Sequence, residues 1–436
     1  MRLLVRQTTN SIEGRIGVPA SKHHLHRALI LASLAPGLSR IVGRCDAGHV
    51  RATISALRSL GTRIEVDGDD LLVLGGAYRA DRPEVSIGGS TSTLHLLTGL
   101  ACLAETPVTF VGLRCLARRP IGPLLAALED FGVKLAPSNG HLPIAIQPGR
   151  PAGGHIRVSG DLSEWLCGLL LLAPFATGPT VISVDGEFRD HACVESTIRM
   201  MRAFGLEIGV ATNGRMFTVE PDQRAAPATV VIPPDPGAAA FGLAAAALHP
   251  ADVLFDGLTE YVDHPESDLL RILADLGVPI GTDQQTGFVR VRHQGIRLAS
   301  VRVDCRTVPG LLPVLAMLAA LAEGTSRFDN VTHVGVAEPD RLAAISQLNA
   351  MGAQLEWHGR HLRCHGVPRL VAATLSSFND HRALMSLAVA GTVAAGTTTL
   401  TFPNAHRVSY PGFLADMCGI GLDMSLARTV TGRPLP

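Results

Sequence analysis

The feature that most constrains the fold of this chain is a segment that recurs six times. Each copy is an apolar helical stretch rich in alanine and leucine, followed by a Gly or Pro break and a short β-branched run. Successive starts are separated by 67, 71, 74, 72 and 72 residues, so six units nearly fill the 436-residue chain. Self-similarity at a near-constant period predicts a repeat-built protein. The copies begin at Arg27, Leu94, Trp165, Ala239, Leu311 and Ala383.

Two kinds of helix are expected to alternate. The recurring segments are apolar nearly all round, which predicts helices that are buried on every side. Amphipathic stretches lie between them, and each ends in an apolar residue followed by Gly and a strand-like run, as glycine favours helix C-termini. We expect each unit to be βαβαββ-like. A generic α/β protein, whose helices resemble one another because alanine and leucine are common, is the alternative. The amphipathic stretches are residues 50–60, 121–131, 194–204, 267–276 and 342–351.

Length and composition limit the other possibilities. A chain of 436 residues is too long for one ordinary core, and the Pro-rich stretch 232–237 before the fourth unit is the best internal boundary. Lys+Arg and Asp+Glu both number 38, so nucleic acid is not an expected partner. The eight cysteines include no Cys-x-x-Cys pair, which favours a reduced cytosol. No apolar run reaches the roughly 20 residues that a bilayer requires, and the start does not resemble a signal peptide. We therefore expect a soluble, cytoplasmic protein.

Five motifs carry a resemblance to a known family. They are VPASKHHLHRAL at 18–29, IGGSTSTLH at 87–95, RRPIG at 118–122, EPDRL at 338–342 and NDHR at 379–382. In this order, they resemble the enolpyruvyl transferases, most closely the 5-enolpyruvylshikimate-3-phosphate synthase (3-phosphoshikimate 1-carboxyvinyltransferase) branch, of which the chain is identified as a diverged member. The resemblance implies carboxyvinyl transfer from phosphoenolpyruvate to a hydroxyl of shikimate 3-phosphate.

The resemblance also implies a fold. The expected fold class is α/β, a two-domain inside-out α/β barrel in which each domain holds three βαβαββ units around buried helices. The chain is expected to cross between domains twice. Residues 18–234 then form the N-terminal (upper) domain, and residues 1–17 with 235–436 form the C-terminal (lower) domain. The active site is expected in the cleft between them.

Phosphoenolpyruvate is a small trianion, and binding it requires several cationic groups aimed at one point. By resemblance these groups are Lys22, Arg119, Arg341 and Arg382, with His381 as a proton donor. Lys22 is one of only two lysines in the chain. The alternatives are a solvated lysine, surface ion pairs for the arginines and a buried hydrogen-bonding role for His381.

Several positions depart from the family pattern. Gly310 stands where the family carries an aspartate, the usual candidate for the base that deprotonates the attacking hydroxyl. Ala337 and Val408 replace family lysines, although Arg407 lies beside Val408. Thr91 replaces a glycine that approaches phosphoenolpyruvate, and the arginine of the same motif is His95.

The acceptor side departs further. The chain has Ser163, Glu164 and Trp165 where the family presents Ser-Ser-Gln, while Asp190 and Cys193 replace a serine and a tyrosine. A carboxylate about 4 Å from a phosphate costs about 4 kcal/mol at an effective dielectric constant near 20, so shikimate 3-phosphate is not the expected acceptor. The alternatives are surface acids placed in the pocket by a shifted alignment, and a core aromatic at position 165.

Histidines are abundant in the motifs, at positions 23, 24, 26, 95, 333 and 381, and can exchange protons near neutral pH. Of the first three, only His23 is expected in the pocket, and no metal site is expected. The predicted catalytic residues are Lys22, Glu338, His381 and His333. The predicted substrate-binding residues are His23, Arg27, Thr91, Ser92, His95, Arg119, Ser163, Glu164, Trp165, Asp190, Arg341, Arg382 and Arg407.

Three functions compete at this point. The first is an enolpyruvyl transferase whose acceptor is an uncharged or cationic cyclic polyol, with a histidine or Glu338 as the base. The second is a lyase or isomerase of secondary metabolism that eliminates water or phosphate from a shikimate-like substrate. The third is an inactive paralogue that binds a metabolite or a partner protein. We expect small-molecule substrates, phosphoenolpyruvate as a co-substrate, no cofactor, no nucleic-acid or membrane partner and a monomeric protein.

Overall fold

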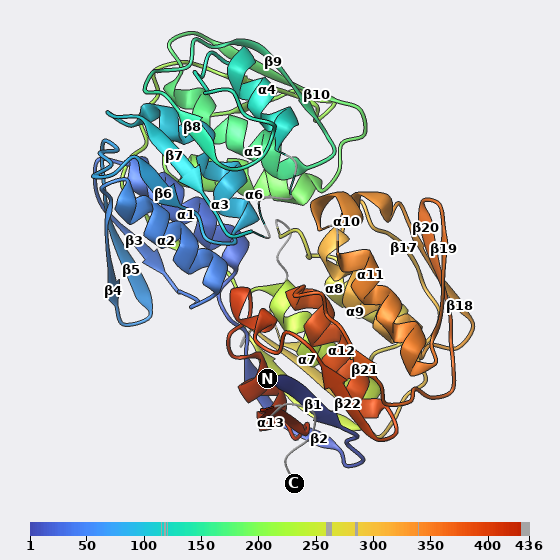
Figure 1. Cartoon of the computed structure of the whole chain (residues 1–436). Helices are drawn as coiled ribbons and strands as arrows, with labels where there is room; N and C mark the ends of the chain where they lie inside the picture. The colour runs from blue at the N-terminus through green and yellow to red at the C-terminus, as the bar shows by residue number, and fades with distance from the viewer. Residues whose placement is uncertain are drawn as a thin grey trace. The chain divides into compact units, whose positions relative to one another are not determined.

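The computed structural model describes residues 1–114, 116, 119, 121–258, 264–283, 287–338 and 340–428. The chain divides into two compact units (Figure 1). The N-terminal unit is Ala20–Pro233, and the C-terminal unit combines Met1–Pro19 with Pro234–Pro436. The boundaries predicted from the sequence, before residue 18 and after residue 234, lie within two residues of this division.

The N-terminal unit contains three sheets. Their strand orders are β13-β3-β5-β4, β6-β7-β8 and β11-β12-β10-β9. The strands are β3 (Gly37–Val42), β4 (Arg63–Asp67), β5 (Asp70–Gly75), β6 (Glu84–Ser86), β7 (Val108–Val111), β8 (Ile144–Ile146), β9 (Gly154–Ser159), β10 (Thr180–Asp185), β11 (Gly209–Val210), β12 (Met216–Val219) and β13 (Thr229–Val231).

The C-terminal unit also contains three sheets, of orders β21-β22-β1-β23, β15-β16-β14-β2 and β17-β18-β20-β19. The strands are β1 (Arg2–Arg6), β2 (Ile12–Gly17), β14 (Ala251–Asp256), β15 (Ile280–Asp283), β16 (Phe288–His293), β17 (Arg302–Asp304), β18 (Thr325–Asp329), β19 (Gln354–His358), β20 (His361–His365), β21 (Thr374–Leu375), β22 (Thr397–Leu400) and β23 (Met424–Ala427).

The six sheets formed by the described residues share one pairing scheme, in which a parallel pair of strands is extended by an antiparallel partner. The parallel pairs are β13 with β3, β6 with β7, β9 with β10, β2 with β14, β17 with β18, and β21 with β22. The repeat deduced from the sequence is therefore one structural unit used six times. β1 pairs antiparallel with both β22 and β23, so the first strand completes a sheet built from the end of the chain (Figure 1).

One helix of each of the six βαβαββ repeats is buried, as predicted. All eight residues of α9 are buried, and in the C-terminal unit α7, α9 and α12 pack on one another. Such helices contribute apolar surface in all directions, which explains why their sequences show no polar stripe. The buried helices are α1 (Lys22–Leu34), α3 (Thr91–Leu97), α5 (Ser163–Leu172), α7 (Pro236–Leu248), α9 (Leu312–Ala319) and α12 (His381–Val393).

The second set of helices shows more exposed residues. Gly61, Gly132, Gly205, Gly277 and Gly352 follow five of these elements with φ between +78° and +92°, a conformation that favours glycine and ends a helix. The set comprises α2 (Gly48–Ser59), α4 (Gly122–Asp130), α6 (His191–Ala203), α8 (Leu269–Asp275), α10 (Thr332–Ala337), α11 (Arg341–Ile345), which a 3₁₀ turn (Ser346–Met351) extends, and α13 (Phe413–Gly419).

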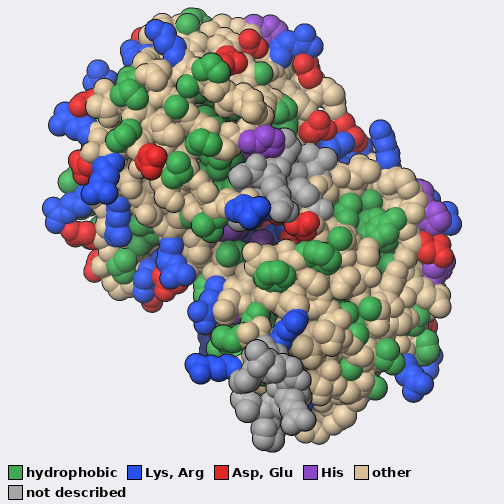
Figure 2. All heavy atoms as spheres, in the orientation of Figure 1, with side chains coloured by type: hydrophobic (Ala, Val, Ile, Leu, Met, Phe, Trp, Pro, Cys, Tyr) green, Lys and Arg blue, Asp and Glu red, His purple; other side chains and the backbone are tan. Residues whose placement is uncertain are grey.

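The surface carries charges of both signs. Figure 2 shows Lys and Arg side chains interspersed with Asp and Glu side chains on the visible face of each unit. Among the described residues, no helix combines the length and apolar character needed to cross a bilayer.

The place of β1 in the C-terminal unit can be tested with the two tryptophans of the chain. Trp165 lies in the N-terminal unit and Trp357 in the C-terminal unit, so variants with a single tryptophan report on each unit separately. Leu3 is fully buried in β1. Leu3→Ala should lower the free energy of unfolding reported by Trp357 by about 3 kcal/mol, because it removes buried methyl groups and leaves a cavity. Urea unfolding followed by fluorescence measures this change.

The matched control is Leu71→Ala, which truncates a buried leucine of β5 in the N-terminal unit. It should shift the transition reported by Trp165 instead. A shift of the Trp165 transition by Leu3→Ala, with no change at Trp357, would contradict the assignment of β1 to the C-terminal unit.

Candidate active site

In the N-terminal unit, α3 and the first turn of α5 bring three predicted site residues together around Glu164. The Ser92 hydroxyl donates to Oε1 of Glu164 at 2.6 Å, and Nδ1 of His95 lies 3.0 Å from Oε2. Glu164 keeps 20% of its side-chain surface exposed, whereas His95 keeps 3%. The ring of Trp165 packs edge-on against that of His95, with centroids 6.3 Å apart. Glu164 is therefore a fixed carboxylate rather than a solvated surface acid.

Glu164 is ionised at neutral pH. Burial alone would raise the pKa of its carboxyl group, but the hydrogen bonds from His95 and Ser92 and the charge of Arg27 favour the carboxylate. Together they lower the pKa of Glu164 to about 2. A permanent negative charge thus lies among the residues predicted to bind substrate.

Two predicted cations lie in the same neighbourhood. Burial and the charges of Lys22 and Arg119 together lower the pKa of His49 to about 3, while the charge of Glu164 partly offsets them. Lys22, Arg119 and Glu164 therefore each lie near enough to His49 to act on its charge. Arg119 also donates to the hydroxyl of Thr91. His49 was not predicted from the sequence, because it stands in the first turn of α2 outside the family motifs.

Other predicted residues of this unit serve its internal structure. Arg27 is fully buried and donates to the Thr197 hydroxyl at 2.6 Å and to the Cys193 sulfur at 3.0 Å. The Asp190 carboxylate caps α6 by accepting from the backbone N–H of Cys193 at 3.3 Å. The Ser163 hydroxyl donates to the carbonyl of Arg189, and His23 is half-buried in α1. Binding of substrate by these four residues stays a prediction.

In the C-terminal unit, two buried arginines each meet a carboxylate. Nε of Arg341 donates to Oδ2 of Asp380 at 2.9 Å, and Glu338 lies 3.9 Å from the same guanidinium. Asp380 also caps α12 by accepting from the backbone N–H of Ala383 at 2.8 Å. Burial alone would lower the pKa of Arg341, but the two carboxylates raise it. The ion pair thus orients Arg341 at the start of α11.

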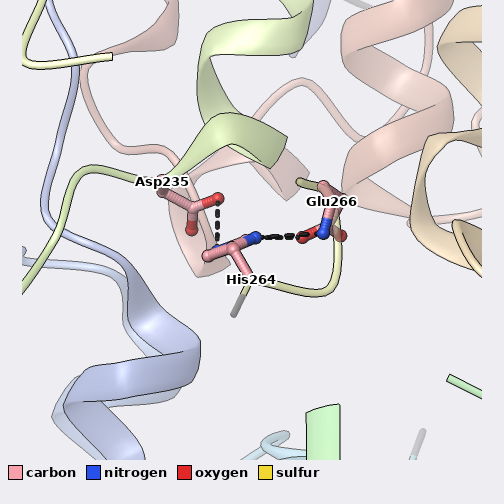
Figure 3. Close-up of side chains that lie close together, drawn as sticks. All are labelled: Asp235, His264 and Glu266. Carbon is pink, nitrogen blue, oxygen red and sulfur yellow. Dashed lines mark hydrogen bonds and ion pairs between the residues drawn. The ribbon is translucent and has the colours of Figure 1, made fainter. Parts of the chain in front are cut away.

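The second arginine, Arg382, is held from two sides. One guanidinium nitrogen donates to Oε1 of Glu266 at 2.6 Å, and the other donates to the carbonyl of Gly310 at 2.9 Å. Glu266 in turn contacts His264, which faces Asp235 on its other side (Figure 3). Asp235, His264 and Glu266 were not predicted from the sequence, because they lie outside the five family motifs.

The remaining predicted residues are spread over three elements. His333 is buried in α10, His381 begins α12 beside Arg382, and Arg407 is exposed in the 3₁₀ turn Ala405–Val408. Residues 118 and 120 of the RRPIG motif lie outside the described residues. Each unit thus carries a cluster of cations, carboxylates and imidazoles that can bind an anion or move a proton.

The low pKa of Glu164 predicts an acid-sensitive N-terminal unit. A carboxyl group whose pKa falls on folding stabilises the protein above its unfolded pKa, near 4.3, and this contribution is lost as the pH falls toward 2. Between pH 6 and pH 3 the wild type should lose about 2 kcal/mol through this group. Glu164→Gln should lack this part of the loss. Urea unfolding followed by Trp165 fluorescence at both pH values measures it, and equal losses in the two proteins would contradict the prediction.

Comparison with known proteins identifies the family. The family described as EPSP synthase (3-phosphoshikimate 1-carboxyvinyltransferase) matches residues 6–417. A relative from Methanocella arvoryzae named 3-phosphoshikimate 1-carboxyvinyltransferase is 34% identical over 425 residues, which cover 96% of this chain and 99% of the relative. A Methanocaldococcus jannaschii relative of the same name is 29% identical, covering 98% of this chain and 100% of the relative.

Solved structures share the fold. An EPSP synthase structure from Acinetobacter baumannii superimposes with a TM-score of 0.82 at 21% identity, covering 98% of this chain and 99% of that chain. The enolpyruvyl transferase NikO from Streptomyces tendae superimposes with a TM-score of 0.79 at 19% identity, covering 97% and 98% of the two chains. Both confirm the two-domain α/β fold expected from the sequence. The chain is a transferase that belongs to the EPSP synthase family of enolpyruvyl transferases.

Proposed function

We propose that the protein transfers the carboxyvinyl group of phosphoenolpyruvate to a hydroxyl group of a cyclic polyol that carries no phosphate. The observation that carries this proposal is the ionised carboxylate of Glu164, fixed by Ser92 and His95 and acting, like Lys22 and Arg119, on the charge of His49. The family membership supports the reaction type, and Glu164 supports the choice of acceptor.

The cations support the use of phosphoenolpyruvate. Lys22 and Arg119 lie together in the N-terminal unit, and carboxylates orient Arg341 and Arg382 in the C-terminal unit. Charge-assisted hydrogen bonds from such groups are the strongest that a protein offers to phosphate and carboxylate oxygens. An inactive paralogue would have no need to keep all four.

Glu164 argues against a phosphorylated acceptor. Its two oxygens already accept from Ser92 and His95, so the carboxylate cannot turn away when a ligand binds. A phosphate group at about 4 Å would be repelled by about 4 kcal/mol at an effective dielectric constant near 20. A neutral or cationic acceptor avoids this cost, and its hydroxyl groups can donate to Glu164.

The reaction balances without a cofactor. The acceptor O–H bond breaks and its oxygen forms a bond to C2 of phosphoenolpyruvate, while the electron pair of the C2=C3 double bond takes up a proton at C3. The C2–O bond to phosphate then breaks with its electron pair on the phosphate oxygen, and C3 gives up a proton as the double bond forms again. The hydroxyl proton requires a base, and inorganic phosphate is the second product.

Shikimate 3-phosphate is the second candidate acceptor. Relatives up to 34% identical over nearly the whole chain are named 3-phosphoshikimate 1-carboxyvinyltransferase, which favours this substrate. The two candidates share phosphoenolpyruvate and differ only in the phosphate on the acceptor, so one assay separates them.

The assay measures phosphate release from phosphoenolpyruvate with shikimate 3-phosphate, shikimate or an uncharged cyclic polyol such as inositol. We expect turnover with an unphosphorylated acceptor and a kcat/KM about 1000-fold lower with shikimate 3-phosphate, the factor to which about 4 kcal/mol corresponds. Glu164→Ser should raise kcat/KM for shikimate 3-phosphate by a factor of about 1000, because it removes the repelling charge.

Glu195→Gln, at an exposed position of α6, is the matched control and should leave these ratios unchanged. Ordinary turnover of shikimate 3-phosphate by the wild type would establish the second candidate instead. Absence of phosphate release with every acceptor would contradict carboxyvinyl transfer itself.

A further inference from the structure

The space beside Gly310 is filled by a carboxylate from another part of the chain. A Cβ atom at this position would collide with Oε1 of Glu266 and would lie 2.9 Å from Cζ of Arg382. Gly237 is similar, since its Cβ atom would lie 3.2 Å from Cδ of Glu266 and 3.2 Å from a terminal nitrogen of Arg382. Two glycines thus make room for the ion pair of Glu266 and Arg382. The ion pair therefore leaves no space for a side chain at position 310.

Glu266 is a buried charge with a fixed orientation. Its side chain is 3% exposed, and Oε1 accepts from Arg382 at 2.6 Å. A buried ion pair is costly to form and is kept only where its geometry and further hydrogen bonds compensate. Arg382 has such a bond to the carbonyl of Gly310. The second oxygen of Glu266, Oε2, faces His264.

His264 can hold a proton in either of two satisfied states. Its Nδ1 lies 3.0 Å from Oε2 of Glu266 and also 3.0 Å from the backbone nitrogen of Glu266. With a proton, Nδ1 donates to Oε2; without it, Nδ1 accepts the backbone N–H. Neither state leaves this nitrogen unpaired, so moving a proton between the carboxylate and the imidazole requires little rearrangement.

Asp235 supports the charged state of the imidazole. Its Oδ1 lies 3.8 Å from Nε2 of His264, and the same oxygen accepts the backbone N–H of Ala238 as the cap of α7 (Figure 3). His264 is fully buried, so a positive charge on its ring depends on nearby carboxylates. The three side chains form the order carboxylate, imidazole, carboxylate; in Ser-His-Asp enzymes a single carboxylate orients the catalytic imidazole and stabilises its charged form.

The charges favour a proton over a divalent cation. One donor atom from each of the three residues lies within 4.8 Å of the others, a spacing that a metal ion could also use. Asp235, Glu266 and Arg382 together carry one net negative charge, as two carboxylates and one guanidinium. One proton on His264 brings this set to neutrality, whereas a divalent ion would leave it positive. Arg382 also already occupies Oε1 of Glu266.

We propose that Glu266 is the catalytic base of the transfer reaction and that His264 and Asp235 are positioning residues that share its proton. The acceptor O–H bond breaks, the electron pair forms the new C–O bond, and the proton moves to the Glu266 carboxylate and then to Nδ1 of His264. It leaves with the phosphate product. This inference rests on the proposed function, because it concerns the base that the reaction needs.

The test compares Glu266→Gln with the wild type by steady-state kinetics, with phosphoenolpyruvate and the acceptor found active. Gln keeps the size of the side chain and an acceptor oxygen for Arg382, but it cannot take a proton. We expect kcat to fall about 100-fold with KM for phosphoenolpyruvate within threefold of the wild type, the effect of losing a general base. A kcat within threefold of the wild type, whether or not KM rises, would overturn the assignment.

A second pair of variants keeps the test decisive if Glu266→Gln folds poorly. His264→Asn retains an acceptor near Nδ1 but cannot hold the proton, and it should lower kcat about tenfold with KM unchanged; an unchanged kcat would contradict the role of His264. Glu266→Asp keeps a carboxylate that can take a proton. It should retain at least tenfold more kcat than Glu266→Ala, and an equal kcat for these two variants would contradict the assignment.

Two controls distinguish a general base from a nonspecific charge effect and from a bound metal ion. Asp252→Asn removes an acid of the same unit whose ion pair with Arg290 is partly exposed, and kcat should not change. Dialysis against EDTA should also leave kcat unchanged, whereas a loss that Zn²⁺ or Mg²⁺ restores would overturn the proton assignment. The wild type is assayed first. An inactive wild type contradicts the proposed function, while an active wild type with an equally active Glu266→Gln contradicts this inference alone.

Discussion

The burial of guanidinium groups organises both units of this protein. An unpaired charge in the interior costs several kcal/mol, so every buried arginine dictates which groups surround it. Arg27 brings Thr197 and Cys193 of α6 to α1. Arg341 recruits Asp380, which at the same time caps α12 and so fixes the start of the helix that carries Arg382. The polar framework of each cluster follows from these requirements.

The repeat made the fold predictable from sequence. Apolar helices and glycine-ended amphipathic helices are local signals, and they recur at a near-constant spacing, the first kind six times and the second five times along the chain. Gly61 and Gly352 illustrate the point, since both end a helical element with φ near +90°. Such backbone requirements can be predicted from one residue type, glycine, without knowledge of distant contacts.

The partners of the site residues could not be predicted in the same way. Glu266 and Arg382 form an ion pair although they are 116 residues apart in the sequence. Glu266 also lies just before the amphipathic helix α8, where an acid is ordinarily solvated. Family motifs fix residue types but not their contacts. Arg27, which lies in a motif, contacts α6, and Asp190, which replaces a family serine, caps it, whereas Glu164, which departs from the family pattern, joins Ser92 and His95.

The charges of the two clusters differ in a way that bears on their roles. In the N-terminal unit, Lys22, Arg27 and Arg119 outnumber the carboxylate of Glu164. In the C-terminal unit, Arg341 and Arg382 are outnumbered by four carboxylates, and Glu266 contributes to raising the pKa of Arg341 as well as pairing with Arg382. These four are Asp235, Glu266, Glu338 and Asp380.

Excess positive charge binds anions, and excess negative charge favours the uptake of protons. Under the proposed function, affinity for phosphoenolpyruvate should therefore depend mainly on the N-terminal cluster, and proton acceptance on the C-terminal cluster. Absence of a side chain at Gly310 fits this division, because a second acid there would collide with Glu266 and add further negative charge beside Arg382. Under the proposed assignment, the carboxylate of the base comes from Glu266, and the chain segments that must support it are those that carry His264 and Asp235.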